Sequence, residues 1–279
     1  MKISDNIYAK LETYNPSGSV KDRMISFLVG RAIDRGDISE SSVFVEATSG
    51  NTGIALSMFG AALGISTIII MPSNMSLERK QMMRSYGAKI IEVGPSDFKG
   101  AIDLRMKMCE SDNKFWSPMQ FENQENIDCH KMITGPEIAN QIALHGEWSA
   151  FISGAGTGGT LSGVQNYIRT SGLNTKTILM SPLEDATHHG IQGVNDGADF
   201  LLDKSSIDLE ISVSTEEAIE RAMRLSKETG LLVGISSGAN IVAAENYVAN
   251  FEVKGNVVTM LCDRGERYLS IFNKHGRGL

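Results

Sequence analysis

Short apolar runs alternate along the chain with segments whose apolar residues recur at helical spacing. The apolar runs are closed by polar residues, glycine or proline, and they predict strands at 42–46, 67–71, 89–93, 150–153, 177–180 and 256–261. The helical spacing is clearest at 51–63 and again from 76 to the glycine at 87. Strand and helix therefore follow each other with short connections.

This alternation predicts an α/β fold with mostly parallel sheets flanked by helices on both faces. The stretch 115–133 is more polar and less regular than its surroundings, so a boundary between two α/β lobes is expected there. A chain of 279 residues is long enough for two such lobes. We predict lobes at 1–120 and 121–279.

Composition narrows the function classes. A hydrophobic content of 42% supports a core, and a net charge of −7 argues against nucleic-acid or anionic-membrane binding. Three scattered cysteines, without a signal segment or a long apolar run, indicate reduced thiols in a cytoplasmic protein. The pair His188–His189 has no second group of candidate ligands, so no metal is expected.

Lys21 follows a Pro/Gly/Ser turn at 15–20 and is expected to open a helix. At the positive end of a helix dipole a charged lysine is disfavoured, so its amine loses a proton more readily. A neutral amine is the form that attacks a carbonyl to make a Schiff base. A solvated surface lysine is the alternative when this residue is considered by itself.

The glycine-rich run 154–160 lies between a predicted strand and a predicted helix. Glycines let main-chain N–H groups approach an anion, and a helix amino terminus favours negative charge, so a phosphate loop is indicated. The run also satisfies G-x-G-x-x-G, and Glu184 follows the next strand at about the spacing of a ribose-binding acid. A dinucleotide site and a purely structural turn therefore remain alternatives.

Two other polar runs join a strand-like run to a helix. Thr48, Ser49, Asn51 and Thr52 lie in the first, where hydroxyls, an amide and main-chain N–H groups could bind a substrate carboxylate. Ordinary helix capping explains such residues about equally well. The second run, 234–240, favours the capping interpretation when taken alone. Ligands in open α/β sheets bind where strands lead into helices, so these loops could line one cleft.

Three of these motifs, the turn before Lys21, the polar run that contains 48–52 and the glycine-rich run 154–160, together resemble the fold-type-II pyridoxal phosphate enzymes. These enzymes are two-lobed and similar to the tryptophan synthase β chain, and within them the resemblance is to the cysteine synthases. The resemblance runs from about residue 7 to 268. It implies pyridoxal 5'-phosphate as cofactor, with Lys21 as the Schiff-base and proton-transfer lysine and Asn51 at the ring hydroxyl. It also implies a phosphate loop and a partner of the pyridine nitrogen, which correspond to Gly156, Thr157, Gly158, Gly159, Thr160 and to Ser236. The substrate carboxylate would be bound by Thr48, Ser49, Thr52 and Gln120.

The reaction implied by the resemblance is β-replacement. O-acetyl-L-serine loses acetate to leave an α-aminoacrylate intermediate, and sulfide, or thiosulfate, adds to give L-cysteine. A serine beside the pyridine nitrogen makes a weaker electron sink than an aspartate would, which favours loss of a β-substituent over transamination. A cystathionine β-synthase-like enzyme, a serine/threonine dehydratase and a non-catalytic paralogue that binds a partner are the alternatives.

Two features bear on the subtype and the assembly. The run Cys262–Tyr268 looks closer to the B-type cysteine synthases, whereas 190–193 looks closer to the A-type. Family members carry a further amino-terminal strand element before the segment at 7–12, and this chain lacks it. The resemblance implies a homodimer, and the missing element is expected to affect stability or oligomerisation.

Overall fold

The computed structural model describes residues 1–48, 50–185, 189–194 and 200–276. The chain forms two compact units. We call residues 15–123 the small unit, and residues 1–14 with 124–279 the large unit. The internal boundary falls within the polar stretch that the sequence indicated, but the first fourteen residues pack with the large unit and not with the lobe 1–120.

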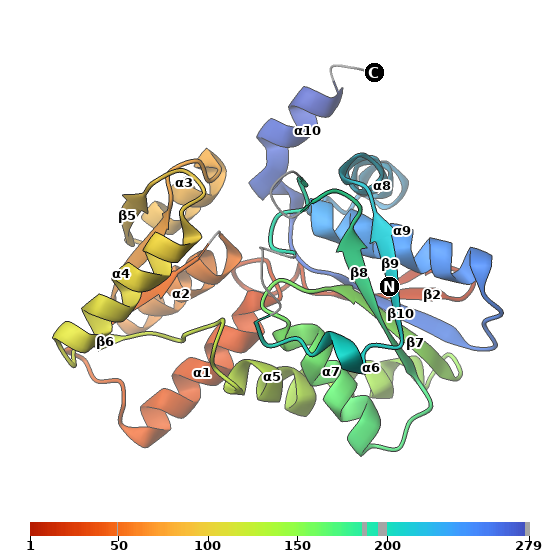
Figure 1. The fold of residues 1–279 in the computed structure, drawn as a ribbon, viewed down its shortest axis with the longest axis horizontal. Coiled ribbons are helices and arrows are strands. Elements are labelled where there is room, and N and C mark those ends of the chain that lie inside the picture. The colour runs from red at the N-terminus through yellow and green to blue at the C-terminus, as the bar shows by residue number, and fades with distance from the viewer. Residues whose placement is uncertain (49, 186–188, 195–199, 277–279) are drawn as a thin grey trace. The chain divides into compact units, whose positions relative to one another are not determined.

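The small unit is built on a parallel four-stranded sheet in the order β5-β4-β3-β6 (Figure 1). Helices cover both of its faces. Buried residues of α1, α2 and α3 pack together with strand residues such as Phe44 and Ile69, while Ala101 of α4 packs with Val45 and Ile70. The elements are β3 (Val43–Ala47), β4 (Ser66–Pro72), β5 (Lys89–Val93), β6 (Phe115–Trp116), α1 (Lys21–Arg35), α2 (Asn51–Leu63), α3 (Leu77–Ser85) and α4 (Phe98–Ser111).

The large unit contains a six-stranded sheet in the order β1-β2-β10-β7-β8-β9, parallel except for β1 (Figure 1). Its main core combines strand residues such as Ile152 and Met180 with the buried faces of α8 and α9. The strands are β1 (Lys2–Ser4), β2 (Ile7–Leu11), β7 (Trp148–Gly154), β8 (Lys176–Pro182), β9 (Leu209–Val213) and β10 (Asn256–Leu261). The helices are α5 (Glu125–Cys129), α6 (Gly135–Ile142), α7 (Gly159–Thr170), α8 (Thr215–Thr229), α9 (Ile235–Asn250) and α10 (Leu269–Gly276), with a π-helix η1 at His130–Thr134 and 3₁₀ turns at Lys204–Ser206 (η2) and Gly265–Tyr268 (η3).

The six strands predicted from the hydrophobic pattern are all present, and α2 has the predicted bounds. The pattern did not identify β2, although it determines where the first residues pack. Ile7 and Ala9 are buried in the large-unit core, and β2 pairs in parallel with β10 over the full length of the strand. Because this pairing satisfies the main chain of β2, the amino-terminal segment belongs to the large unit.

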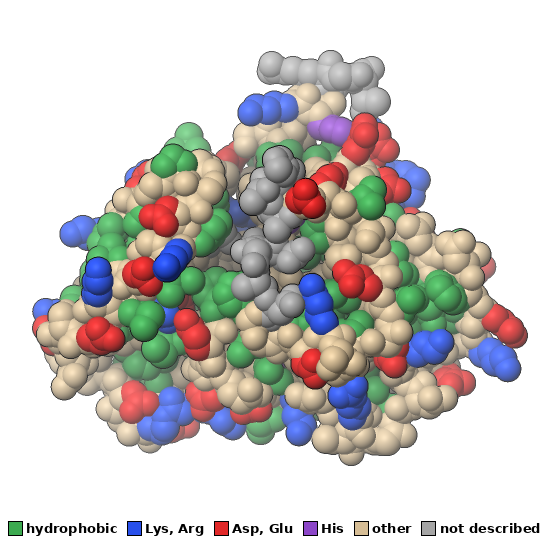
Figure 2. Space-filling view, viewed as in Figure 1, with side chains coloured by type: hydrophobic (Ala, Val, Ile, Leu, Met, Phe, Trp, Pro, Cys, Tyr) green, Lys and Arg blue, Asp and Glu red, His purple; other side chains and the backbone are tan. Residues whose placement is uncertain are grey.

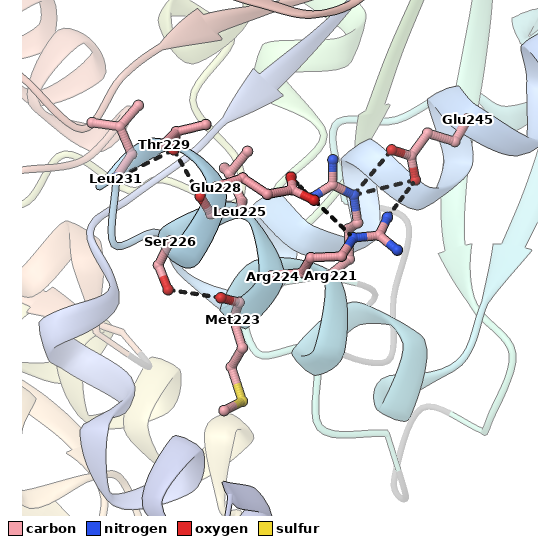
Figure 3. Close-up of polar contacts among 9 residues, drawn as sticks. All are labelled: Arg221, Met223, Arg224, Leu225, Ser226, Glu228, Thr229, Leu231 and Glu245. Atoms are coloured by element: carbon pink, nitrogen blue, oxygen red, sulfur yellow. Dashed lines mark hydrogen bonds and ion pairs between the residues drawn. The ribbon is translucent and has the colours of Figure 1, made fainter.

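α8 packs closely against α9, the helix that begins in the run 234–240. Arg221 of α8 has a side chain that is only 6% exposed, and it forms ion pairs with Glu245 of α9 at 3.0 Å and with Glu228 at 3.3 Å (Figure 3). At Gly238 a Cβ would lie 2.0 Å from the carbonyl oxygen of Ala218, so the two helices meet there with no side chain between them.

Acidic and basic side chains are interspersed over the face shown in Figure 2. Among the described residues, no helix combines the length and the apolar character that a membrane span requires.

Candidate active site

Lys21 is the first residue of α1, as the sequence predicted. The preceding turn is closed by the Asn15 side-chain amide, which donates to the Ser19 carbonyl at 2.9 Å, and by Gly18, whose φ of +86° lies in the left-handed region. The Lys21 main-chain N–H donates to the Ser19 hydroxyl at 3.3 Å. The lysine is therefore held at the helix start by a turn whose geometry is local.

Asp22 supports the same turn, and it was not identified from the sequence. It is buried, and it accepts hydrogen bonds from the main-chain N–H of Ser17 at 2.6 Å and from the Ser17 hydroxyl. An acidic residue in the first turn of a helix was the available signal. Because Asp22 holds Ser17, five positions earlier in the chain, it fixes the direction in which the chain enters α1.

The predicted carboxylate-binding run follows β3 and leads into α2. Thr48 is buried, its N–H donates to the Ile70 carbonyl at 3.1 Å, and its hydroxyl accepts from Gly50 N–H at 3.1 Å. Asn51 is the first residue of α2, and Ser49 lies outside the described residues. The bond from Gly50 N–H to the Thr48 hydroxyl is the local side-chain contact expected of a capping residue, and both of its ends lie within the loop.

Thr52 and Gln120 are brought together although they are 68 positions apart. The Thr52 hydroxyl donates to Gln120 Oε1 at 2.6 Å, and Gln120 Nε2 donates to the Ala47 carbonyl at 3.1 Å. Both side chains are buried. The structure thus joins two of the residues that the resemblance assigned to one substrate group.

Glu46 lies behind this loop and was missed by the sequence analysis. It is fully buried at the end of β3, where Oε1 accepts from Ala47 N–H at 2.7 Å and Oε2 from Gln120 N–H at 3.1 Å. Burial raises the pKa of Glu46 to about 7 from an ordinary value of 4.5, although the Arg105 guanidinium and the two N–H donors act to lower it. A charged residue inside an otherwise apolar strand was the signal that could have revealed it.

Arg105 is the nearby buried cation. Its side chain is 1% exposed, and it donates to both oxygens of Glu122 at 3.0 and 3.3 Å. Because two parallel N–H···O bonds orient a guanidinium strongly, Arg105 is held between the interior carboxylate Glu46 and the half-exposed carboxylate Glu122.

The glycine-rich run lies in the large unit, between β7 and α7. Gly158, at the amino-terminal cap of α7, has a φ of +87° and no side chain, and the Thr157 hydroxyl accepts from Gly159 N–H at 3.3 Å. A Cβ at Gly156 would lie 2.2 Å from the Gly193 carbonyl oxygen, so the main chain is closely packed there. A helix start that follows a glycine turn can present main-chain N–H donors to an anion.

Two residues of the adjacent α5–η1 segment hold the hydroxyls of this loop. Asn126 Nδ2 donates to Thr157 Oγ1 at 3.1 Å, and His130 Nε2 lies 3.1 Å from Thr160 Oγ1. The other ring nitrogen of His130 lies 2.9 Å from the Thr134 hydroxyl. Both Asn126 and His130 are buried. The sequence shows that Asn126 and His130 are four residues apart. It does not show that they contact the glycine-rich loop.

Ser236 lies in the first turn of α9, in the large unit, and is buried. Its neighbours tie this turn to the strand ends. The Ser237 hydroxyl accepts from Cys262 N–H at 2.9 Å, and Asn240 accepts from Gly154 N–H at 2.8 Å and donates to the Met260 carbonyl at 3.0 Å. The helix start is therefore fastened to β7 and β10.

Glu184, the acid that a dinucleotide site would require, has a structural role. Its Oε1 accepts from the main-chain N–H of Thr215, the first residue of α8, at 2.8 Å. Among the described residues, no cluster of three or more His, Cys, Asp or Glu side chains is arranged to hold a metal ion. His188 lies outside the described residues.

The fold and these loops define a class of protein. The model of the family described as pyridoxal-phosphate dependent enzymes matches residues 2–263. The chain belongs to this family. The cofactor of this family carries a single phosphate group, which favours the phosphate-loop interpretation of the glycine-rich run over the dinucleotide interpretation.

Comparison with individual relatives places the chain more narrowly within this family. Cysteine synthase B of Campylobacter jejuni is 41% identical over 96% of this chain and 92% of that protein, and a cysteine synthase of Staphylococcus aureus is 38% identical over 96% and 90%. A crystal structure of a hydrogen sulfide-producing enzyme from Fusobacterium nucleatum is 38% identical with a TM-score of 0.89, covering 95% of this chain and 82% of that one. The resemblance to cysteine synthases predicted from the sequence is thus confirmed.

The residues present fit the cofactor. The donor set that a phosphate needs is main-chain N–H groups at a helix start and nearby hydroxyls, and the glycine-rich loop has both in the first turn of α7 and in Thr157 and Thr160. A primary amine able to form the covalent link opens α1 at Lys21.

Proposed function

We propose that this protein is a cysteine synthase that converts O-acetyl-L-serine and sulfide to L-cysteine and acetate. The observation that carries the proposal is the 38–41% identity with two cysteine synthases over 96% of the chain. The buried bond between Thr52 and Gln120 supports it, because it brings together two side chains that the resemblance assigns to one substrate group.

The cofactor, when bound, supplies an electron sink for the α-carbon of the amino acid. We assign to Lys21 the covalent attachment, the removal of the α-proton and its later return. Thr48, Ser49, Thr52 and Gln120 would bind and orient the substrate carboxylate. For the cofactor, we assign Asn51 to the ring hydroxyl, Ser236 to the pyridine nitrogen, and Gly156, Thr157, Gly158, Gly159 and Thr160 to the phosphate.

The test is cysteine formation by the purified protein loaded with the cofactor. Lys21→Ala should lose the covalent attachment, seen as cofactor that denaturation still releases after borohydride reduction, whereas the reduced wild type retains it. The substitution should also reduce turnover by about a thousandfold or more, as expected when a residue with several catalytic roles is removed. Lys89→Ala, at an exposed lysine of the same unit, is the matched control and should behave as the wild type. Full activity in Lys21→Ala would refute the assignment.

The sulfur donor is tested by offering sulfide, thiosulfate and homocysteine separately. Sulfide is the expected co-substrate, and preference for homocysteine would identify a cystathionine β-synthase-like enzyme. Release of an oxo acid without any thiol would identify a dehydratase. A protein that binds the cofactor and turns over none of these would support the non-catalytic alternative.

A second candidate function is sulfide release from L-cysteine. Two hydrogen sulfide-producing enzymes of Fusobacterium nucleatum match with TM-scores of 0.89 and 0.88 at 38% and 34% identity. The same proton removal at the α-carbon, followed by loss of the thiol from the β-carbon, would give this reaction. Sulfide production from cysteine faster than cysteine formation from O-acetylserine would favour it.

A homodimer and a cytoplasmic location remain predictions from the sequence. Light scattering coupled to size exclusion should give about twice the chain mass of 30.2 kDa. A mass equal to one chain would refute the dimer.

A further inference from the structure

We propose that Glu46 is a positioning residue for the substrate-carboxylate site, because its buried carboxylate holds the main chain of Gln120 in place. Oε2 of Glu46 accepts from Gln120 N–H at 3.1 Å, while Oε1 is anchored by Ala47 N–H at 2.7 Å. The inference rests on the proposed function only where it assigns Gln120 to the substrate. The hold on the main chain is a property of the protein itself.

The main chain at Gln120 needs such a hold. The preceding residue, Met119, has a φ of +51°, a conformation that is uncommon for a residue with a side chain. Local preference therefore does not favour this turn, and tertiary contacts have to maintain it. Glu46 provides one of them from the end of β3, 74 positions earlier in the chain.

The side chain of Gln120 depends on the same contacts. Its Oε1 accepts from the Thr52 hydroxyl at 2.6 Å, and its Nε2 donates to the Ala47 carbonyl at 3.1 Å. Glu46 therefore fixes the main chain of both Gln120 and Ala47, and Ala47 in turn fixes the amide. A shift of the Gln120 main chain would break the Thr52 bond, because these buried bonds tolerate little displacement.

The groups that face Glu46 make its charge state sensitive to pH. They are Arg105 and Cys109 of α4 and Glu122 of the segment that carries Gln120. Above about pH 7 the carboxylate is an anion with acceptor lone pairs for both N–H groups. Below that pH, a proton on one oxygen removes an acceptor from one of the two N–H donors.

Glu46→Gln tests the proposal in the cofactor-loaded enzyme. A glutamine presents one oxygen and one NH₂, so in either orientation an N–H donor faces another donor. We expect hydrogen exchange at the Gln120 amide to accelerate about tenfold or more, and the KM for O-acetylserine to rise about tenfold with kcat changed less than threefold. Glu110→Gln, at an exposed position on α4, removes the same charge and should change neither quantity.

The pH profile distinguishes positioning from a general structural role. In the wild type, protection of the Gln120 amide against local opening, corrected for intrinsic exchange, should fall about tenfold between pH 8.5 and pH 5.5, while the free energy of unfolding of the whole unit changes in the opposite direction. Arg105→Met removes the positive charge and should move the midpoint of this change to higher pH. The wild-type series also serves as the test if Glu46→Gln does not fold.

The outcomes separate the two proposals. Exchange at Gln120 that is independent of pH and of the Glu46 substitution would overturn the positioning role, whatever the enzyme does. Wild-type protein that shows the exchange behaviour but does not turn over O-acetylserine would overturn the proposed function and leave the hold of Glu46 on Gln120 established. A rise in KM equal in Glu110→Gln and Glu46→Gln would also overturn the positioning role.

Discussion

Glu46 should make the stability of the small unit fall as pH rises through neutrality. Burial raises the pKa of this carboxyl to about 7 in the folded protein from an ordinary value of 4.5. The pKa of Glu46 is higher in the folded protein than in the unfolded chain. Its contribution to the free energy of unfolding is therefore fully present below about pH 4.5 and is lost as pH rises through about 7. The neutral carboxyl suits the interior, whereas the anion there loses its hydration.

The magnitude follows from the two pKa values. The full shift corresponds to about 3 kcal/mol of unfolding free energy, and about 2 kcal/mol of it falls between about pH 5.5 and about pH 8. The stability of the wild type minus that of Glu46→Gln should therefore decrease by about 2 kcal/mol over this range. Subtraction of the two profiles cancels the titration of the groups that do not interact with Glu46.

Guanidinium chloride unfolding of the apoprotein at several pH values measures this difference. Trp116 reports on the small unit, since its ring lies 5.3 Å from that of Phe44, and a Trp148→Phe background removes the other tryptophan. The same subtraction with Glu110→Gln, whose carboxylate stays in water on folding, should change by less than about 0.5 kcal/mol. A difference between wild type and Glu46→Gln that stays constant with pH would refute the reasoning.

Two further substitutions test the packing and the site. Thr52→Val removes the hydroxyl that donates to Gln120 and should raise the KM for O-acetylserine about tenfold, whereas Thr52→Ser keeps the donor and should stay near the wild type; equal kinetics in both variants would contradict the role of the bond. Gly238→Ala would place a Cβ 2.0 Å from the Ala218 carbonyl oxygen and should lower the unfolding free energy by about 2–4 kcal/mol. The matched change Gly30→Ala, in α1 with open space around it, should be neutral or stabilise by up to about 1 kcal/mol, and thermal unfolding that ranks the two variants the other way would contradict the packing argument.

Local patterns were sufficient for much of the fold. The strands and the helix 51–63 follow from hydrophobic periodicity, and the start of α1 at Lys21 follows from a turn whose bonds span at most five residues. Such features are encoded within a short window, so an isolated sequence displays them. The motif residues at 48–52 and 156–160 were found for the same reason.

Contacts between distant segments could not be predicted from these patterns. The hydrophobic pattern does not identify β2, and only its pairing with β10 assigns the first residues to the large unit. Asn126 and His130 carry no motif of their own, and their importance comes from the loop hydroxyls that they hold.

The sequence by itself determined the α/β class, the cofactor family and the local start of each candidate loop, because periodicity, turn chemistry and motif spacing are properties of neighbouring residues. Only the tertiary structure decided that Glu46 and Arg105 lie behind the Gln120 loop, and that Glu184 holds the start of α8. The tertiary structure also determines the charge state of Glu46. Burial sets the free energy of a charged group, and burial exists only once segments far apart in the chain have packed together.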